Sequence, residues 1–266
     1  MQEVIKASGE KERFSSKKIY RGIVLAGGSK KLASDTLDYV RKNFKQDITT
    51  EEILSLVLKS LKSERGVAAR YDLKRAIMSL GPSGFPFETY FSAILSEHGY
   101  KTSLRQVLKG KNVNQEIDII AKNKHSYMVE CKYHNNSGNY AGLKEAMYTY
   151  ARFLDVKKYH LDFPWLATNT KCSDSAKNYA KGVDLKITSW NFPKDESLQK
   201  MIEDKKLYPV TLVRDISSEN KNKLYSAHVM FIRDLVNLSF NDLKRKTKIS
   251  DDVLKKIISE AKEILG

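Results

Sequence analysis

The chain is poor in cysteine and in long apolar runs. Only two cysteines, Cys131 and Cys172, occur in 266 residues, so a disulfide framework is excluded and a reducing compartment, the cytoplasm, is expected. The five histidines show neither a His pair nor a CxxC at ligand spacing, which argues against a structural zinc site. No apolar run reaches about 18 residues, and no basic start precedes an apolar segment. Neither a membrane span nor a secretory signal is therefore expected.

Acidic residues are scarce relative to basic ones. Lys and Arg total 47 against 32 Asp and Glu, giving a formal net charge of +15. Such an excess favours a polyanionic partner, because each cation placed against a phosphate releases counterions from nucleic acid. The alternative is a basic surface without a ligand. Hydrophobic residues at 41% and charged residues at 30% are typical of a soluble globular chain, long enough for two compact domains or one large one.

The amino-terminal part reads as a small hairpin followed by helices. Strand-like pieces at 4–6 and 12–14 flank a turn at Ser8 and Gly9. Apolar residues at helical spacing then predict four helices, of which the third opens with a capping box and the fourth covers 67–80. The breakers in Gly-Pro-Ser-Gly-Phe-Pro, residues 81–86, mark a domain boundary. We therefore predict a first domain over residues 1–84.

Beyond this boundary strands and helices alternate. The pattern predicts helices at 87–96, 143–153 and 173–180, and strands at 116–121, 126–132, 165–168 and 185–190. Alternation of this kind favours an α/β sheet covered by helices, which we assign to a second domain over residues 85–215. Residues 216–266 read as helices again. The predicted fold class is thus α+β and α/β, with a hairpin and four helices, then the α/β domain, then a short helical segment.

Charged residues on two neighbouring strands carry the chemistry. Side chains alternate along a strand, so Glu130 and Lys132 project from one face. Asp118 lies on the preceding strand, close enough across a hairpin to share a site with Glu130. Two carboxylates would bind Mg²⁺ or Mn²⁺ through hard oxygen ligands, and the metal would hold a scissile phosphate and a water. Lys132 would supply a cation beside the attacking water. Glu88, at the edge of an apolar helix face, needs a partner, and the metal site is a candidate.

The order of a helix Glu, an EID strand, a turn and an ExK strand resembles the PD-(D/E)xK nuclease superfamily. Residues 87–202 resemble Mrr-type restriction endonucleases in particular. The resemblance implies a catalytic set of Glu88, Asp118, Glu130 and Lys132, in which the three carboxylates are metal ligands. The alternative is a set of surface charges on a solvated hairpin.

Three further polar residues lie close to this set in the sequence. Glu116 faces the same side of its strand as Asp118, one pair further along. His134 and Tyr150 follow the ExK strand and are candidates for a phosphate contact. A structural role is the alternative for both.

The hairpin and first helices resemble the ATP-cone domain known from ribonucleotide reductase regulation, over residues 3–82. Lys6 lies on the hairpin, Glu12 on the returning strand, Lys18 at the start of the first helix and Thr50 at the start of the third. The resemblance implies that Lys6, Lys18 and Thr50 contact ATP or dATP, while Glu12 orients the base or ribose. Lysines and a helix start both suit phosphate. The alternative is a four-helix docking module without a ligand.

Two details qualify these resemblances. The chain has Ala7 and Ser8 where ATP cones usually have Arg and Asp. No Walker motif is present, so we expect nucleotide binding without hydrolysis.

At the carboxy terminus, residues 243–265 faintly resemble a helix-hairpin-helix but lack its GxG, and a generic helical appendage is the alternative.

These observations predict a Mg²⁺-dependent DNA endonuclease regulated by ATP or dATP, acting in restriction or defence against foreign DNA. Its partners would be DNA and nucleotide, with no membrane. A homodimer or higher homo-oligomer is expected, because cleavage of a duplex needs two active sites. Two alternatives stay open: a structure-selective repair or junction nuclease, and a nucleotide-responsive DNA-binding regulator with an inert nuclease fold.

Overall fold

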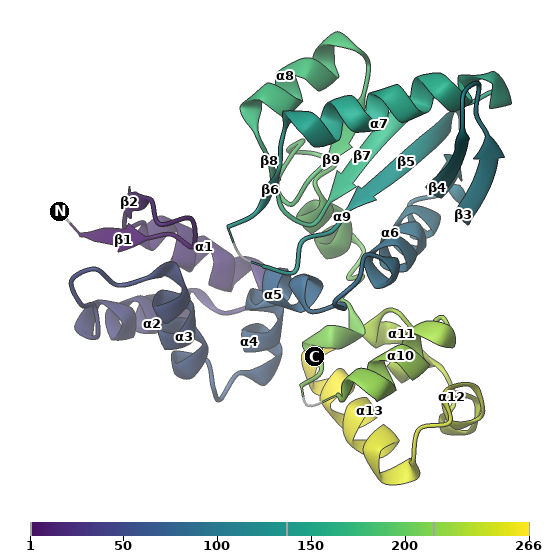
Figure 1. Cartoon of the computed structure of the whole chain (residues 1–266). Helices are drawn as coiled ribbons and strands as arrows, with labels where there is room; N and C mark the ends of the chain where they lie inside the picture. Colours follow the sequence, from purple (N-terminus) through teal and green to yellow (C-terminus); the bar gives the residue numbers. More distant parts are fainter. Residues whose placement is uncertain (1, 137, 215, 266) are drawn as a thin grey trace. The chain divides into compact units, whose positions relative to one another are not determined.

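The computed structural model describes residues 2–136, 138–214 and 216–265, and the chain forms two compact units (Figure 1). Unit 1 combines residues 1–76 with 210–266, and unit 2 is the intervening segment 77–209. The three domain limits expected from the sequence stay a prediction. Within the described residues, no helix is both long enough and apolar enough to span a membrane.

Unit 1 opens with an antiparallel hairpin of β1 (Glu3–Ile5) and β2 (Lys11–Arg13). Helices α1 (Ser16–Leu25), α2 (Lys30–Lys42) and α3 (Thr50–Ser60) follow. The Thr49–Glu52 capping box opens α3 as expected, since the Thr49 side chain accepts from the Glu52 amide at 3.1 Å and the Glu52 carboxylate accepts from the Thr49 amide at 2.8 Å. Apolar faces of these helices meet around fully buried Ile23, Val40 and Val57.

The single helix expected at 67–80 is wrong, because the structure has two helices, α4 (Arg65–Tyr71) and α5 (Leu73–Met78). Asp72 separates them. Its N–H donates to the carbonyls of Ala68 and Ala69, which closes α4. Its own carbonyl accepts from Arg75 and Ala76, which opens α5. The Asp72 carboxylate pairs with the Arg75 guanidinium of α5 at 3.1 Å, a contact that a continuous apolar pattern does not reveal.

The carboxy-terminal helices belong to the same unit. They are the short η2 (Val210–Leu212), then α10 (Ser218–Ser226), α11 (Ile232–Asn237), α12 (Phe240–Thr247) and α13 (Asp251–Leu265). Helix α13 packs on α11 and α4. Its contact with α4 is close, because a Cβ on Gly66 would lie 2.7 Å from the Glu263 carbonyl. Arg65 and Glu263 form an ion pair at 3.2 Å across the same contact.

Unit 2 is built on a mixed five-stranded sheet in the order β3-β4-β5-β7-β9. Strands β3 (Lys101–Lys109), β4 (Asn114–Lys122) and β5 (Ser126–Lys132) are antiparallel neighbours. Strands β7 (Phe163–Thr168) and β9 (Lys186–Thr188) continue the sheet in parallel with β5. A second small sheet pairs β6 (Tyr140–Ala141) with β8 (Lys171–Cys172). The sequence pattern predicted no helix or strand over residues 97–115, so strand β3 was not expected.

Helices cover both faces of this sheet (Figure 1). Helix α6 (Phe85–Glu97) packs on one face, where Phe91 meets the Trp165 ring of β7 at 5.9 Å. Helices α7 (Leu143–Val156) and α8 (Asp174–Gly182) cover the other face, where Leu166 is buried against α8. Successive β7 residues thus serve opposite faces, as a fully covered strand requires. The short η1 (Lys157–Tyr159) follows α7, and α9 (Leu198–Asp204) follows β9.

Candidate functional site

The β4–β5 hairpin brings the sequence-predicted Asp118 and Glu130 together. The pairing of these strands runs from Lys122 with Ser126 to Ile119 with Val129. One step further the ladder ends, because the Asp118 carboxylate accepts the amide N–H of Cys131 at 2.7 Å. That bond holds Asp118, in the middle of β4, beside the Glu130–Lys132 segment at the point where β4 and β5 stop pairing.

Glu88 approaches the same place from α6. It lies in the first turn of that helix and is 8% exposed. Its carboxylate accepts from the Arg105 guanidinium at 3.2 Å. Arg105 interrupts β3 with a left-handed backbone (φ 49), and the β3–β4 pairing skips it between Leu104 and Gln106. The register is the same on both sides of this break, so Arg105 falls opposite Asp118, and its side chain reaches the buried Glu88.

Arg152 of α7 holds Glu130. Its guanidinium donates to the Glu130 carboxylate and to the Glu116 carbonyl, and to the Gln115 side chain at 3.0 Å. The Arg152 and Glu130 side chains are only 11% and 15% exposed. Gln115 also donates to Asp155 at 3.0 Å, which ties this arginine to the carboxy-terminal end of α7. The ion pair is therefore a partly buried, supported contact and not a loose surface pair.

The pKa values of all three carboxylates are raised, mainly by burial. Burial raises the pKa of Glu88, and the charge of Asp118 raises it further against the opposing effect of Arg105. Burial also raises the pKa of Asp118, although the Cys131 N–H and Arg152 lower it. For Glu130, burial and the Asp118 charge outweigh Arg152 and bring the pKa to about 7. Raised pKa values in neighbouring carboxylates, of which Glu88 is buried and the other two are half-buried, are typical of functional sites.

The remaining sequence candidates differ in their placement. Lys132 is exposed at the end of β5, and its charge lowers the pKa of Glu130. The His134 backbone is clamped by the Asn169 side chain, which accepts its N–H at 2.8 Å and donates to its carbonyl at 2.7 Å. Its Nε2 is buried, with no hydrogen-bond partner within the described residues. Tyr150 packs on the rings of Phe153 and Tyr179, so it serves the core beneath α7.

The donor chemistry of the cluster suits a hard divalent cation. Glu88, Asp118 and Glu130 offer only carboxylate oxygens, the ligands that Mg²⁺ and Mn²⁺ prefer. In the described part of the chain, no group of three or more His, Cys, Asp or Glu side chains is arranged to hold a metal ion. Two of the three carboxylates instead face arginines, Glu88 through Arg105 and Glu130 through Arg152.

Sequence reasoning missed both arginines. Arg105 lies on β3, a strand whose side chains alternate between exposed and half-buried without an apolar stripe. Arg152 lies on α7 and reaches β5 across 22 residues, a contact that helical spacing cannot reveal. A signal did exist for Arg152, since an arginine on a helix with buried Thr149, Phe153 and Val156 lies close to a core face.

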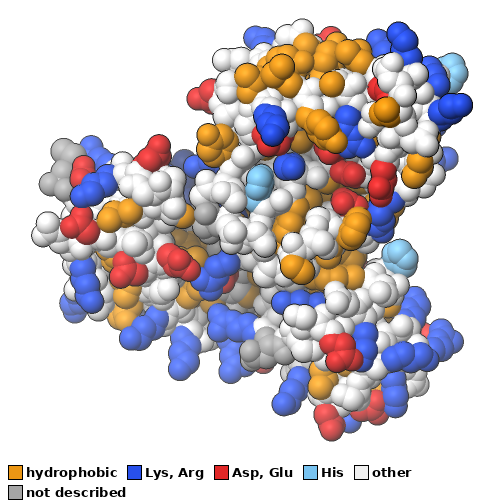
Figure 2. Space-filling view, viewed as in Figure 1, with side chains coloured by type: hydrophobic (Ala, Val, Ile, Leu, Met, Phe, Trp, Pro, Cys, Tyr) orange, Lys and Arg blue, Asp and Glu red, His pale blue; other side chains and the backbone are white. Residues whose placement is uncertain are grey.

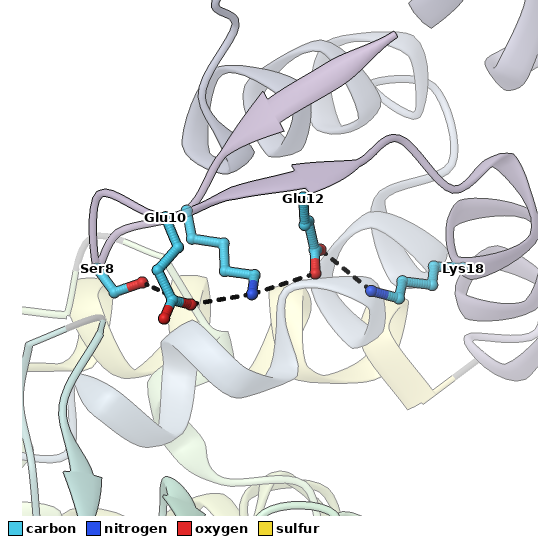
Figure 3. Close-up of polar contacts among 5 residues, drawn as sticks. Ser8, Glu10, Glu12 and Lys18 are labelled. Atoms are coloured by element: carbon cyan, nitrogen blue, oxygen red, sulfur yellow. Dashed lines mark hydrogen bonds and ion pairs between the residues drawn. The ribbon is translucent and has the colours of Figure 1, made fainter. Parts of the chain in front are cut away.

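The predicted nucleotide-binding residues form a second cluster, on the hairpin of unit 1 (Figure 3). A chain of alternating charges runs through Glu10, Lys6, Glu12 and Lys18, and the Ser8 hydroxyl donates to Glu10 at one end. Lys6 lies 3.2 Å from Glu10 and 3.5 Å from Glu12, and Lys18 lies 3.1 Å from Glu12. Although burial raises it, the two lysines bring the pKa of Glu12 below its ordinary value.

Thr50 lies next to this hairpin. The Ile5 N–H donates to the Ile48 carbonyl at 3.0 Å, and Ile5 forms a parallel bridge with Thr49. The residues that follow these two in the chain are Lys6 and Thr50. The hairpin and the amino-terminal end of α3 therefore bring Lys6, Lys18 and Thr50 to one region of unit 1, where exposed lysines and helix amides are both present.

Comparison with protein families matches three parts of the chain. Residues 2–77 match the ATP cone domain, and residues 81–194 match the restriction endonuclease family. Residues 208–265 match the carboxy-terminal region described as AF1548-like. The ATP cone followed by a restriction-endonuclease-like domain confirms the order and the fold class expected from the sequence.

Individual proteins and solved structures are also similar to the chain. An uncharacterized protein of Archaeoglobus fulgidus is 44% identical over 174 residues, which are 65% of this chain and 98% of the relative. A crystal structure titled as the protein of unknown function AF1548 is 41% identical, with a TM-score of 0.65 over 69% of this chain and 99% of its own. The structure of Can2 from Sulfobacillus thermosulfidooxidans in complex with cyclic tetra-adenylate is 13% identical, covering 74% of this chain and 64% of its own. Its TM-score of 0.34 carries no argument.

Proposed function

The chain belongs to the family of the AF1548 protein and joins an ATP cone to a restriction-endonuclease-like domain, and from this premise we propose a Mg²⁺-dependent DNA endonuclease regulated by ATP or dATP. The observation that supports it best is the convergence of Glu88, Asp118 and Glu130. They come from a helix and two strands, and all three have raised pKa values. Nothing in the packing of a hairpin requires one buried and two half-buried carboxylates in one place.

Each residue of the cluster has a distinct part in this proposal. Glu88, Asp118 and Glu130 would hold Mg²⁺ or Mn²⁺, which when bound supplies a Lewis acid and a polarised water for phosphodiester hydrolysis. Lys132, exposed at the end of β5, would stabilise negative charge developing on the phosphate. Arg105 and Arg152 would act as positioning residues that hold Glu88 and Glu130 in place while the cluster carries no cation.

Cleavage of supercoiled plasmid tests the nuclease. We expect nicking or linearisation with Mg²⁺ and none with EDTA, and loss of cleavage in Lys132→Ala. Lys124→Ala is the matched control, because this lysine is exposed in the turn of the same hairpin, far along the strands from Asp118. Equal cleavage by both variants would refute the role of Lys132. No cleavage by the wild type of modified, linear or branched DNA would favour a DNA-binding regulator.

The nucleotide site is proposed at Lys6, Lys18 and Thr50, with Glu12 orienting the base or ribose. In the ligand-free chain the two lysines are paired with Glu10 and Glu12. Phosphate oxygens would compete for these lysines, while the amides at the start of α3 add donors that suit an anion. Binding would thus rearrange an ion-pair network that already spans the hairpin, and would do so without hydrolysis.

Calorimetry with ATP and dATP tests this site. A charge-assisted hydrogen bond contributes about 1.5–3 kcal/mol, so Lys18→Ala should weaken binding roughly tenfold or more. Lys17→Ala is the control, since Lys17 is an exposed neighbour on the same helix. Equal effects of the two substitutions would contradict the assignment. Repeating the plasmid assay with each nucleotide then tests regulation.

The biological setting and the assembly are part of the same proposal. Restriction or defence against foreign DNA predicts that modified and unmodified plasmids are cleaved at different rates. A structure-selective repair nuclease predicts instead a preference for branched over linear DNA. Homodimerisation, which duplex cleavage favours, is measured by light scattering with and without nucleotide.

A further inference from the structure

A basic groove crosses one face of α3 in unit 1, away from the hairpin. It consists of two adjoining hollows of about 450 and 620 Å³ that share Ser55 and Lys59. The smaller extends from Lys59 towards the end of α2, and the larger extends towards residues 211–221, which precede and begin α10. Neither hollow is lined by Lys6, Lys18 or Thr50, so this groove is distinct from the proposed nucleotide site.

The groove holds more cations than carboxylates. Six cations form no close ion pair and no side-chain hydrogen bond within the described residues: Lys42, Lys45, Lys59, Lys62, Arg214 and Lys221. The charges of Arg214 and Lys45 still act on Asp72 and Glu52. The carboxylates that line the groove are already engaged. Glu52 is held in the α3 capping box, and Asp72 pairs with Arg75 at 3.1 Å. The groove therefore carries a net positive potential.

Figure 2 shows Lys and Arg side chains gathered along the lower edge of the part of the molecule built from α2, α3 and α4. Such a row of cations could be an ordinary solvated helix face. Two features argue against this reading. The cations line a hollow instead of a convex surface, and they come from α2, α3 and the segment before α10, which are far apart in sequence.

We propose that this groove binds the phosphate backbone of double-stranded DNA, as a contact separate from the nuclease unit. The elongated shape suits a linear polyanion, since α3 alone is roughly 16 Å long and duplex DNA carries one charge per about 1.7 Å of its axis. A single triphosphate would reach only part of it. Apolar side chains of Phe44, Ile48 and Leu56 line the smaller hollow together with its cations, and the Phe44 ring packs on that of Phe14 with centroids 5.0 Å apart.

The function of such a contact is positional. Backbone contacts carry no sequence information, but they fix where a protein lies on the duplex and slow its release. The inference holds whether or not unit 2 cleaves DNA, because it concerns unit 1 alone.

The test is the salt dependence of DNA binding by the full-length chain, measured by fluorescence anisotropy in EDTA so that cleavage plays no part. The groove variant is Lys59→Gln, Lys62→Gln and Lys221→Gln together. Each lost phosphate contact lowers the slope of log affinity against log salt by about 0.9, so the slope should fall by about 2.7. Between about 50 and 200 mM NaCl, the loss of affinity should then be about 40-fold smaller than in the wild type.

The control removes the same charge elsewhere in unit 1. Lys30→Gln, Lys31→Gln and Lys256→Gln together alter three exposed lysines that line neither hollow. A fall in slope confined to the groove variant supports the proposal, and an equal fall in both variants overturns it. An unchanged slope combined with lost ATP binding by calorimetry also overturns it and assigns the groove to a nucleotide. Circular dichroism verifies that both variants keep their helices.

Discussion

Replacing Glu130 with Gln should stabilise unit 2 in the absence of metal, increasingly as the pH rises from about 4.5 to 7. The pKa of Glu130 is raised from 4.5 to about 7 by burial and by Asp118. Between these two pKa values the folded chain holds a proton that the unfolded chain has lost. The stability of the wild type therefore declines as pH rises from about 4.5 to 7 and is flat above it. The carboxamide of Gln does not ionise, so the variant avoids that decline.

The size of the effect follows from the same two pKa values. A pKa of about 7 in the fold against 4.5 in the unfolded chain corresponds to about 3 kcal/mol, as an upper value. The Glu130→Gln variant should match the wild type near pH 4.5 and exceed it by up to about 3 kcal/mol at pH 8. Adding Mg²⁺ should make the wild type more stable than the Glu130→Gln variant, because a ligand that binds only the folded wild type stabilises it by mass action.

Tryptophan fluorescence during urea unfolding isolates the relevant unit. The chain has two tryptophans, Trp165 and Trp190, and both lie in the segment 77–209 that forms unit 2. Curves recorded in EDTA from pH 5 to 8 give the free energy of unfolding of each variant by linear extrapolation. A Gln variant that is less stable than the wild type at pH 8 would refute the reasoning. So would a difference that stays constant across the pH range, because the effect would then be one of packing.

Three further outcomes are expected. Arg152→Met should tighten Mn²⁺ binding, measured by calorimetry, because the arginine competes for the Glu130 carboxylate; weaker binding would show that Arg152 assembles the site instead. Gly110→Ala should lower the free energy of unfolding in the tryptophan assay by about 1–3 kcal/mol, because a Cβ there would collide with the Asp155 carboxylate. An unchanged urea unfolding curve would contradict this steric clash. Thr49→Ala should lower the free energy of unfolding by about 1 kcal/mol and speed hydrogen exchange at the first amides of α3. Unchanged exchange would show that the Thr49 side chain does not stabilise the start of this helix.

The strands that carry the candidate site could be found from the sequence because their signal is local. Alternation in Ser126–Lys132 assigns a face to each residue, and the turn before it fixes the partner strand. The capping box at Thr49 is equally local, since all its atoms lie within four residues. Such features depend only on residues that are close together in the sequence.

What the sequence could not supply depends on distant contacts. Strand β3 lies at the edge of the sheet, so its residues need no apolar run, and its pairing with β4 is interrupted at Arg105. The pairing of Arg152 with Glu130 exists only after α7 has packed on the sheet. The break at Asp72 is a local feature instead, marked by the ion pair of Asp72 with Arg75, which the apolar pattern does not reveal.

The connections between the two units have a consequence for engineering the chain. Within unit 1, the Thr211 hydroxyl donates to the Ala76 carbonyl at 2.7 Å. The chain therefore leaves unit 1 after Ala76 and re-enters it at Val210 from neighbouring points, and the entire restriction-endonuclease-like segment is an insertion between them. A segment inserted between two neighbouring points adds little strain to the domain that contains it, because the two ends of the inserted segment need not be drawn together. Joining Ala76 to Val210 through a few glycines would give a shortened chain that keeps the hairpin, the basic groove and the carboxy-terminal helices as one continuous protein.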